Sequence, residues 1–183
     1  MRAGRFCLGG PVLALVLLAG CSSIGSTVRS VSETVVPSCP GASFLPDASK
    51  LTRFREGSLG DLTDVRFESE IRRVDASCSW EGDAVVANLE LEFVLAKGPA
   101  FTGENPEIVY FVGTTDKHRA VISKEKLTTT AVLPPDAKAR AWKEKLAHRI
   151  PLAEGKSGSD YSIFIGFQLS REELDYNRRW YGR

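Results

Sequence analysis

The chain has few side chains whose type and spacing match known metal chemistry. His118 and His148 are its two histidines, and neither has a second metal ligand at the spacing that zinc sites use. Asp61 and Asp64 follow two glycines, but this stretch lacks the length and the closing Glu of a calcium loop. We therefore expect histidines at the surface or its rim, a solvated turn near Asp61, and no bound metal.

Nucleophile and phosphate-binding motifs occur only as fragments. Ser123 and Lys126 form a Ser-x-x-Lys pair without the other elements of the penicillin-binding pattern. Residues 155–157 read Gly-Lys-Ser without the glycine loop that precedes them in a P-loop. Glu90 and Glu92 are about 7 Å apart along one face of a predicted strand, a separation close to that of a glycosidase pair, but a solvated strand face explains them better. The sequence predicts no catalytic residue, no cofactor and no enzymatic activity.

The most specific motif lies in the first residues. Arg2 and Arg5 precede a short apolar run over 6–19, and small residues lead directly into Cys21. A basic start, a short apolar segment and a small-residue cleavage site together make a secretory signal. The run is too short to span a bilayer, which takes about 20 apolar residues.

The sequence Leu18-Ala19-Gly20-Cys21 resembles the lipobox of bacterial lipoproteins. The resemblance implies that residues 1–20 are a signal peptide and that cleavage leaves Cys21 as the new N-terminus. It also implies diacylglyceryl and acyl chains on Cys21, which anchor the protein stably in a membrane. The alternative is an ordinary cleaved signal that happens to end at a cysteine.

The residues after Cys21 bear on the membrane to which the protein belongs. In lipoproteins an aspartate just after the lipidated cysteine often retains the protein in the inner membrane. Here Ser22 and Ser23 follow Cys21. In a Gram-negative organism the resemblance therefore implies the outer membrane, with the domain facing the periplasm.

The four cysteines differ in their expected fates. If the chain is a lipoprotein, Cys7 leaves with the signal, Cys21 is lipidated, and Cys39 and Cys78 remain in an oxidising compartment. We predict a Cys39–Cys78 disulfide, which would close a loop of about 40 residues and stabilise the fold by roughly 4 kcal/mol. Two free buried thiols, or a metal pair without further ligands, are the alternatives.

Composition divides the remaining chain into a tether and one domain. Residues 21–38 hold the lipidated Cys and a Ser-rich stretch of the kind that stays flexible. Residues 39–183 have the length of a single domain. The formal charge of +1 becomes about −1 without the signal, so we expect no nucleic-acid partner.

Alternation with a period of two runs through most of this domain. Residues 85–95 place apolar side chains on one face and mostly polar ones on the other, which predicts a half-buried strand. The same pattern over 65–80, interrupted by two adjacent arginines, predicts a strand with a bulge. Residues 108–112 fit a central strand, and 161–169 fit a last strong one.

Other segments are less regular. Residues 115–118 fit a turn into 119–124, and the Thr-rich residues 127–133 are β-prone. Residues 47–57 carry a possible N-cap and a closing glycine, which predicts a short helix. Residues 136–150 fit either a strand or a helix, and the strand is favoured because it continues the series. A capping box predicts a second short helix over 170–177.

Together these segments predict a mainly β fold of about seven strands with short flanking helices. The regular spacing favours an antiparallel β-sandwich with an immunoglobulin-like or fibronectin-like outline. The Cys39–Cys78 spacing is too short for a true immunoglobulin domain, and Trp80 follows the second cysteine. The sequence therefore predicts an architecture without a family.

Two surfaces are candidates for interaction. Arg178, Arg179, Trp180 and Tyr181 alternate cationic and aromatic groups, which suits a membrane interface or an anionic glycan. A frayed tail, or a helix that packs Trp180 on the sandwich, is the alternative. The outer face of residues 85–95 could take a partner strand if it lies near a sheet edge.

Three functions fit these observations. The preferred one is a non-enzymatic envelope lipoprotein that binds or scaffolds an envelope protein partner. The second is a small-ligand or lipid-binding sandwich, which an apolar cavity lined by Phe93, Phe111, Phe164 or Phe167 would favour and a tightly packed core would exclude. The third is an envelope hydrolase, which would need a cleft that joins Glu90, Glu92 and Asp160, or one that joins His148 to a nucleophile.

Overall fold

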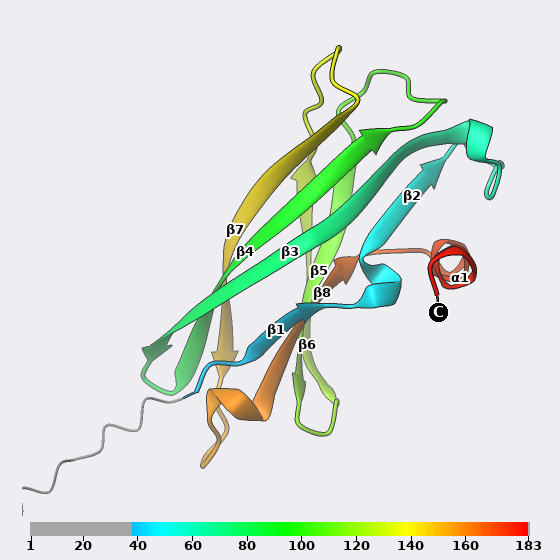
Figure 1. The fold of residues 1–183 in the computed structure, drawn as a ribbon. Helices are drawn as coiled ribbons and strands as arrows, with labels where there is room; N and C mark the ends of the chain where they lie inside the picture. The colour runs from blue at the N-terminus through cyan, green and yellow to red at the C-terminus, as the bar shows by residue number, and fades with distance from the viewer. Residues whose placement is uncertain (1–37, 183) are drawn as a thin grey trace, which may run out of the picture. The chain divides into compact units, whose positions relative to one another are not determined.

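The computed structural model describes residues 38–182. Two four-stranded β-sheets pack on each other to form a β-sandwich, as the alternation predicted (Figure 1). Sheet A has the strand order β1-β8-β5-β6, and sheet B has the order β2-β3-β4-β7. The predicted signal peptide, Cys21 and nearly all of the predicted tether lie outside the described residues.

The eight strands of these sheets differ widely in length. Sheet A contains β1 (Gly41–Phe44), β8 (Tyr161–Phe167), β5 (Glu107–Asp116) and β6 (Val121–Thr130). Sheet B contains β2 (Lys50–Phe54), β3 (Val65–Glu81), β4 (Ala84–Lys97) and β7 (Ala139–Pro151). The helical elements are η1 (Pro46–Ala48), η2 (Leu62–Asp64), η3 (Gly158–Asp160) and α1 (Arg171–Trp180). All strand pairs are antiparallel except β1 with β8, which is parallel and was not predicted.

The long hairpin of β3 and β4 follows the sequence pattern closely. The register of the pair shifts between Ile71 and Arg73, where two adjacent arginines predicted a bulge. Gly82 begins the turn between the strands with φ +61°, a conformation that favours glycine. The predicted strand over 136–150 is confirmed as β7, which pairs with β4 along its whole length.

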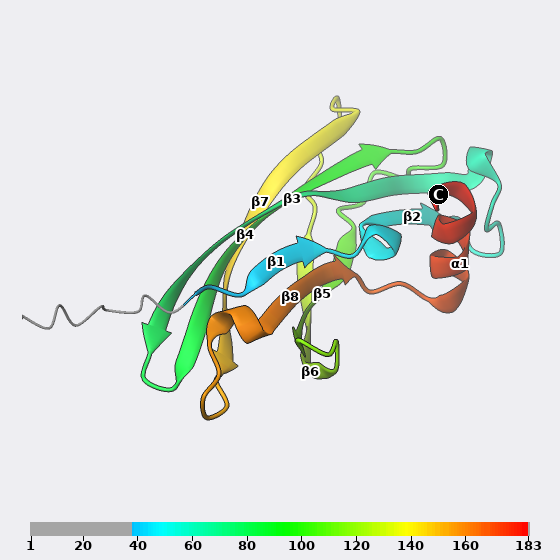
Figure 2. The same ribbon diagram turned by 60° about the horizontal axis from the view of Figure 1, so that its bottom comes forward.

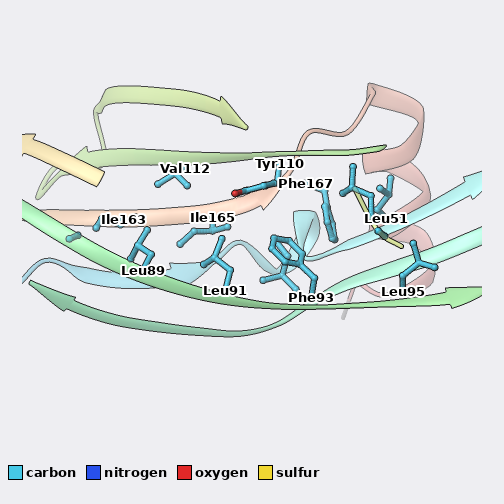
Figure 3. Close-up of a cluster of buried hydrophobic side chains, with 14 of the residues drawn as sticks. Leu51, Leu89, Leu91, Phe93, Leu95, Tyr110, Val112, Ile163, Ile165 and Phe167 are labelled. Carbon is cyan, nitrogen blue, oxygen red and sulfur yellow. The ribbon is translucent and has the colours of Figure 1, made fainter. Parts of the chain in front are cut away.

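The core lies between the two sheets because alternate side chains of each strand point inward (Figure 3). Phe93 of β4 is fully buried at its centre. Its ring centroid lies 5.2 Å from that of Tyr110, 5.3 Å from that of Trp142 and 6.0 Å from that of Phe167. Phe93 thereby connects the four strands β4, β5, β7 and β8.

The predicted Cys39–Cys78 disulfide is confirmed. Its two Cα atoms are 5.9 Å apart. Cys39 lies just before β1 of sheet A, and Cys78 lies in the second half of β3 of sheet B. The bond therefore connects the edge of one sheet to the other sheet, and the chain-entropy argument assigns it roughly 4 kcal/mol.

The short helix expected over 47–57 is wrong. Only the single 3-10 turn η1 is helical, and residues 50–54 form β2, paired with β3. Leu51 and Phe54 are three residues apart, which resembles helical spacing, but they face opposite sides of a strand. Leu51 enters the core, whereas the Phe54 ring packs edge-on against Tyr176 of α1, with ring centroids 5.2 Å apart.

The helix α1 begins at the predicted capping box, where Ser170 and Glu173 bond reciprocally. Figure 2 shows α1 beside the end of β2. The buried Asn177 side chain donates hydrogen bonds to the backbone carbonyls of Asp47 and Lys50, so α1 is an integral part of the fold. No helix within 38–182 is long and apolar enough to cross a membrane.

Candidate functional site

The outer face of sheet A carries two aromatic side chains that the core does not use. In β5 and β8 the inward positions hold core residues such as Val112 and Ile165. The alternate positions place Phe111 and Phe164 on the outer face, where both are half-buried. The register sets Phe111 opposite Gly166 and Phe164 opposite Gly113, so each ring has a glycine as its cross-strand neighbour.

The two glycines have different surroundings. A Cβ atom on Gly166 would lie 2.8 Å from Cβ of Ala48 and 3.0 Å from the Phe111 ring. The Phe111 ring therefore covers Gly166. A Cβ atom on Gly113 would meet nothing closer than 3.5 Å, so the strand surface beside Phe164 stays open.

This open surface is part of a groove made of two adjoining hollows. The first, of about 460 Å³, is lined by Leu45, Phe111, Gly113, Thr114, Thr115, Arg119, Val121, Lys124 and Phe164. The second, of about 420 Å³, is lined by Leu45, Pro46, Asp47, Ala48, Phe111, Lys124, Phe167, Gln168, Leu169, Leu174 and Arg178. The two share Leu45, Phe111 and Lys124, and both volumes lie in the range of small-ligand sites.

The groove is positively charged at one end. Arg119 and Lys124 line the first hollow, and none of the described residues that line it is acidic. Lys124 Nζ lies 4.1 Å from the centroid of the Phe111 ring, in a cation–π contact. In the second hollow, Arg178 pairs with Asp47 at 2.9 Å. Lys124, which lines both hollows, is the other cation there, so the positive charge lies in the first hollow and at the junction of the two.

The groove also holds polar atoms without partners. Among residues 38–182, two buried side-chain polar atoms lack a hydrogen-bond partner, namely Thr115 Oγ1 and Gln168 Oε1. Thr115 lines the first hollow and is 8% exposed, and Gln168 lines the second. An unpaired buried hydroxyl costs about 1–3 kcal/mol, and a ligand in the groove would remove that cost.

A second polar group lies on the inward side of the same strands. His148 Nε2 of β7 is 2.8 Å from Thr114 Oγ1 of β5, and His148 Nδ1 is 4.0 Å from Glu125 Oε2 of β6. The expectation of a surface or rim position is therefore wrong for His148, which is 5% exposed. The register of β7 on β4 sets His148 opposite the buried Ala87 and turns it toward the core.

A carboxylate, an imidazole and a hydroxyl in this order resemble a nucleophile relay. However, Thr114 is 1% exposed, so the hydroxyl is closed to a substrate. The Thr114–His148 contact instead joins the inward faces of sheets A and B. Nearby, burial raises the pKa of the Tyr110 phenol to about 12, and the charges of Glu144 and Glu125 add to the effect.

The carboxylates that a hydrolase would need are separated. Glu90 lies on the outer face of sheet B. Hydrogen bonds from Lys143, which has the larger effect, and from Lys145 lower the pKa of its carboxyl group. Asp160 lies at the end of η3, just before β8 of sheet A, where Ser157 bonds to it. Neither carboxylate lines the groove. In the described part of the chain, no three His, Cys, Asp or Glu side chains gather to hold a metal ion.

The outer face of β4 cannot add a strand, because β4 lies in the middle of sheet B between β3 and β7. That suggestion from the sequence is wrong for this strand. In the described part of the chain the edge strands are β1 and β6 in sheet A, and β2 and β7 in sheet B.

The C-terminal candidates divide into paired and exposed residues. Arg178 pairs with Asp47 and lines the groove, whereas Arg179 is exposed. Trp180 is 59% exposed, and Tyr176 takes the packed position that Trp180 was suggested to fill. Tyr181 lies under Lys50, whose Nζ is 4.3 Å from its ring centroid. Sequence reasoning did not predict a site that includes Arg119, Lys124 and Thr115.

No protein-family model, curated protein or solved structure matches this chain. The structure alone therefore defines its class, a disulfide-linked β-sandwich with a groove on the outer face of one sheet.

The two glycines give a matched pair of stability tests. Gly113→Ala should be neutral or stabilise the fold by about 0.5–1 kcal/mol, because a strand glycine costs that much and the site has room. Gly166→Ala should destabilise it by about 1–3 kcal/mol, because the added methyl meets Ala48 and Phe111. Urea unfolding of both variants would measure the difference, and equal effects would contradict the described groove floor.

His148 should make stability depend on pH. Burial lowers the pKa of folded His148, and the charge of Glu125 partly offsets this. The unfolded chain therefore binds its proton at a higher pH, near the ordinary value of about 6.5. The free energy of unfolding should fall as the pH drops through about 6.5, because the unfolded chain then binds a proton that folded His148 does not. Below the pKa of folded His148 both states are protonated, and this contribution to the fall ends.

The control is His148→Gln, which keeps a partner for Thr114 without the titration. Denaturant unfolding between about pH 7.5 and about pH 5 should show a smaller loss in this variant than in the wild type. An identical loss in both proteins would show that His148 does not cause it.

Proposed function

We propose that this protein is a lipid-anchored, non-enzymatic binding module of a bacterial cell envelope. The groove on sheet A is its binding site, and Cys21 is its membrane anchor. The observation that carries the binding part is the groove itself, which combines aromatic walls, two cations and the buried hydroxyl of Thr115. Within 38–182 that hydroxyl has no hydrogen-bond partner. A few convergent polar groups in an apolar hollow are typical of ligand sites.

The anchor rests on the lipobox resemblance. The described fold is consistent with an oxidising envelope, because a disulfide holds the start of the sandwich to β3. The 17 residues from Ser22 to Ser38 would allow a separation of at most about 60 Å between the anchor and the domain. In a Gram-negative cell we propose that the domain faces the periplasm from the outer membrane.

Of the two binding functions considered, the groove favours a small ligand over a scaffold for a protein partner. Phe111 and Phe164, two of the four aromatic residues named as possible cavity walls, line it. Phe93 lies in the packed core instead, and Phe167 belongs mainly to that core. The packed core around Phe93 counts against a ligand cavity between the sheets, so the small-ligand proposal rests on the groove on the outer face of sheet A.

Site-specific photocrosslinking of the full chain in intact cells tests this function. Val121 is 70% exposed at the rim of the groove, so p-benzoylphenylalanine at this position would react with whatever occupies the site. We expect adducts of defined mass at Val121, on protein found in the membrane fraction. The same probe at Asn88, on the outer face of sheet B, is the control and should give none.

The Cys21→Ala variant is the second arm of the same experiment. It should incorporate no labelled palmitate and should no longer be processed by the lipoprotein peptidase, because it lacks the thiol that takes the lipid. Palmitate labelling equal to that of the wild type would refute the anchor. Equal adducts at both probe positions would refute the groove as the binding site.

A further inference from the structure

We propose that the ligand of the groove is a single-chain fatty carboxylate, bound with its head at the Arg119 and Lys124 end. This inference rests on the proposed function and specifies its ligand. Three observations support this ligand: the charge of the groove, its shape, and the buried Thr115 hydroxyl, which has no hydrogen-bond partner among the described residues.

Charge selects an anion. Arg119 and Lys124 line the first hollow without an acidic residue among its described walls. A guanidinium offers two parallel N–H donors, which match the two oxygens of a carboxylate. Arg119 has φ +65°, an uncommon conformation outside glycine.

Thr115 supplies a further donor at the same end. Its Oγ1 has no partner among the described residues, although the residue is more than nine-tenths buried. Since Thr114 points inward to His148, strand alternation turns Thr115 to the outer face. A carboxylate in the first hollow would accept hydrogen bonds from the Thr115 hydroxyl and from the Lys124 ammonium group, both of which line it.

Shape selects one apolar chain. The two hollows adjoin at Leu45 and Phe111. Beyond Phe111 the walls include Pro46, Leu169 and Leu174. Arg178 there is already paired with Asp47, and Lys124 lies where the two hollows meet. An amphiphile that lies along the groove would place its anion at one end and its hydrocarbon at the other, where burial of apolar surface is favourable.

Calorimetric titration would test the proposal on the mature chain, residues 21–183, carrying Cys21→Ser so that no detergent is needed. The probes are dodecanoate and 1-dodecanol, which share a chain and differ in charge. We expect dodecanoate to bind at one molecule per chain and at least about tenfold more tightly than dodecanol, because bonds to charged groups contribute more than bonds to neutral ones.

Two variants locate the site. Lys124→Gln should weaken dodecanoate about tenfold or more and leave dodecanol unchanged, whereas Lys138→Gln, on the exposed connection between β6 and β7, should change neither. Gly113→Val adds a side chain where a Cβ fits, and should fill the first hollow and weaken both ligands. Its urea midpoint, at or above that of the wild type, would show that it folds.

Several results would overturn the inference. Equal affinity for dodecanoate and dodecanol would remove the role of charge, and unchanged binding by Gly113→Val would place the ligand elsewhere. Tighter binding of dodecyl phosphate, or binding only to phosphatidylglycerol vesicles, would exclude the carboxylate. Dodecanoate could fail to bind while the probe at Val121 still forms adducts. If Gly113→Val then abolishes those adducts, the ligand class is wrong and the groove remains the binding site. If all fail, the proposed function fails too.

Discussion

The packing of Phe93 between the sheets is the contact on which the other features depend. Its ring meets Tyr110, Trp142 and Phe167, and aromatic contacts of this kind add about 0.5–1.5 kcal/mol each to the burial of their surface. Because β5 and β8 must give their inward side chains to this core, their outward positions are fixed by strand alternation. Phe111 and Phe164 occupy these outward positions, and this is why they form the wall of a groove on the face opposite to the core.

One disulfide and one set of hydrogen bonds connect distant segments around that core. The Cys39–Cys78 bond joins the start of the domain to β3, and Asn177 of α1 bonds to carbonyls beside β2. The Leu45 backbone N–H donates to the Ile165 carbonyl of β8 at 2.8 Å, which sets Leu45 and Pro46 beside β8 as part of the groove wall. The helix α1 contributes Leu174 and Arg178 to the same wall. The sequence predicted this helix and named Arg178 as a candidate for interaction, but it did not predict that the helix lines a groove on sheet A.

The sequence predicts the features that are local in this fold. The alternation of β4, the bulge of β3 and the capping box of α1 are all encoded within a few residues. The short strands β1 and β2 were missed because four or five residues give no clear period, and the parallel pairing of β1 with β8 joins distant segments. The groove was missed for the same reason. Its floor depends on the register that sets Phe111 opposite Gly166, and no pattern within either strand contains that information.

The most direct test of the account is an amide chemical-shift map of the protein titrated with dodecanoate. The account predicts that the signals of Gly113, Thr115 and Gln168 move, because these residues line the groove. Signals of Ser77 and Asn88, in the hollow on the outer face of sheet B, should stay in place. Shifts confined to Ser77 and Asn88, or no shifts at saturating dodecanoate, would contradict the claim that the groove on sheet A is the binding site.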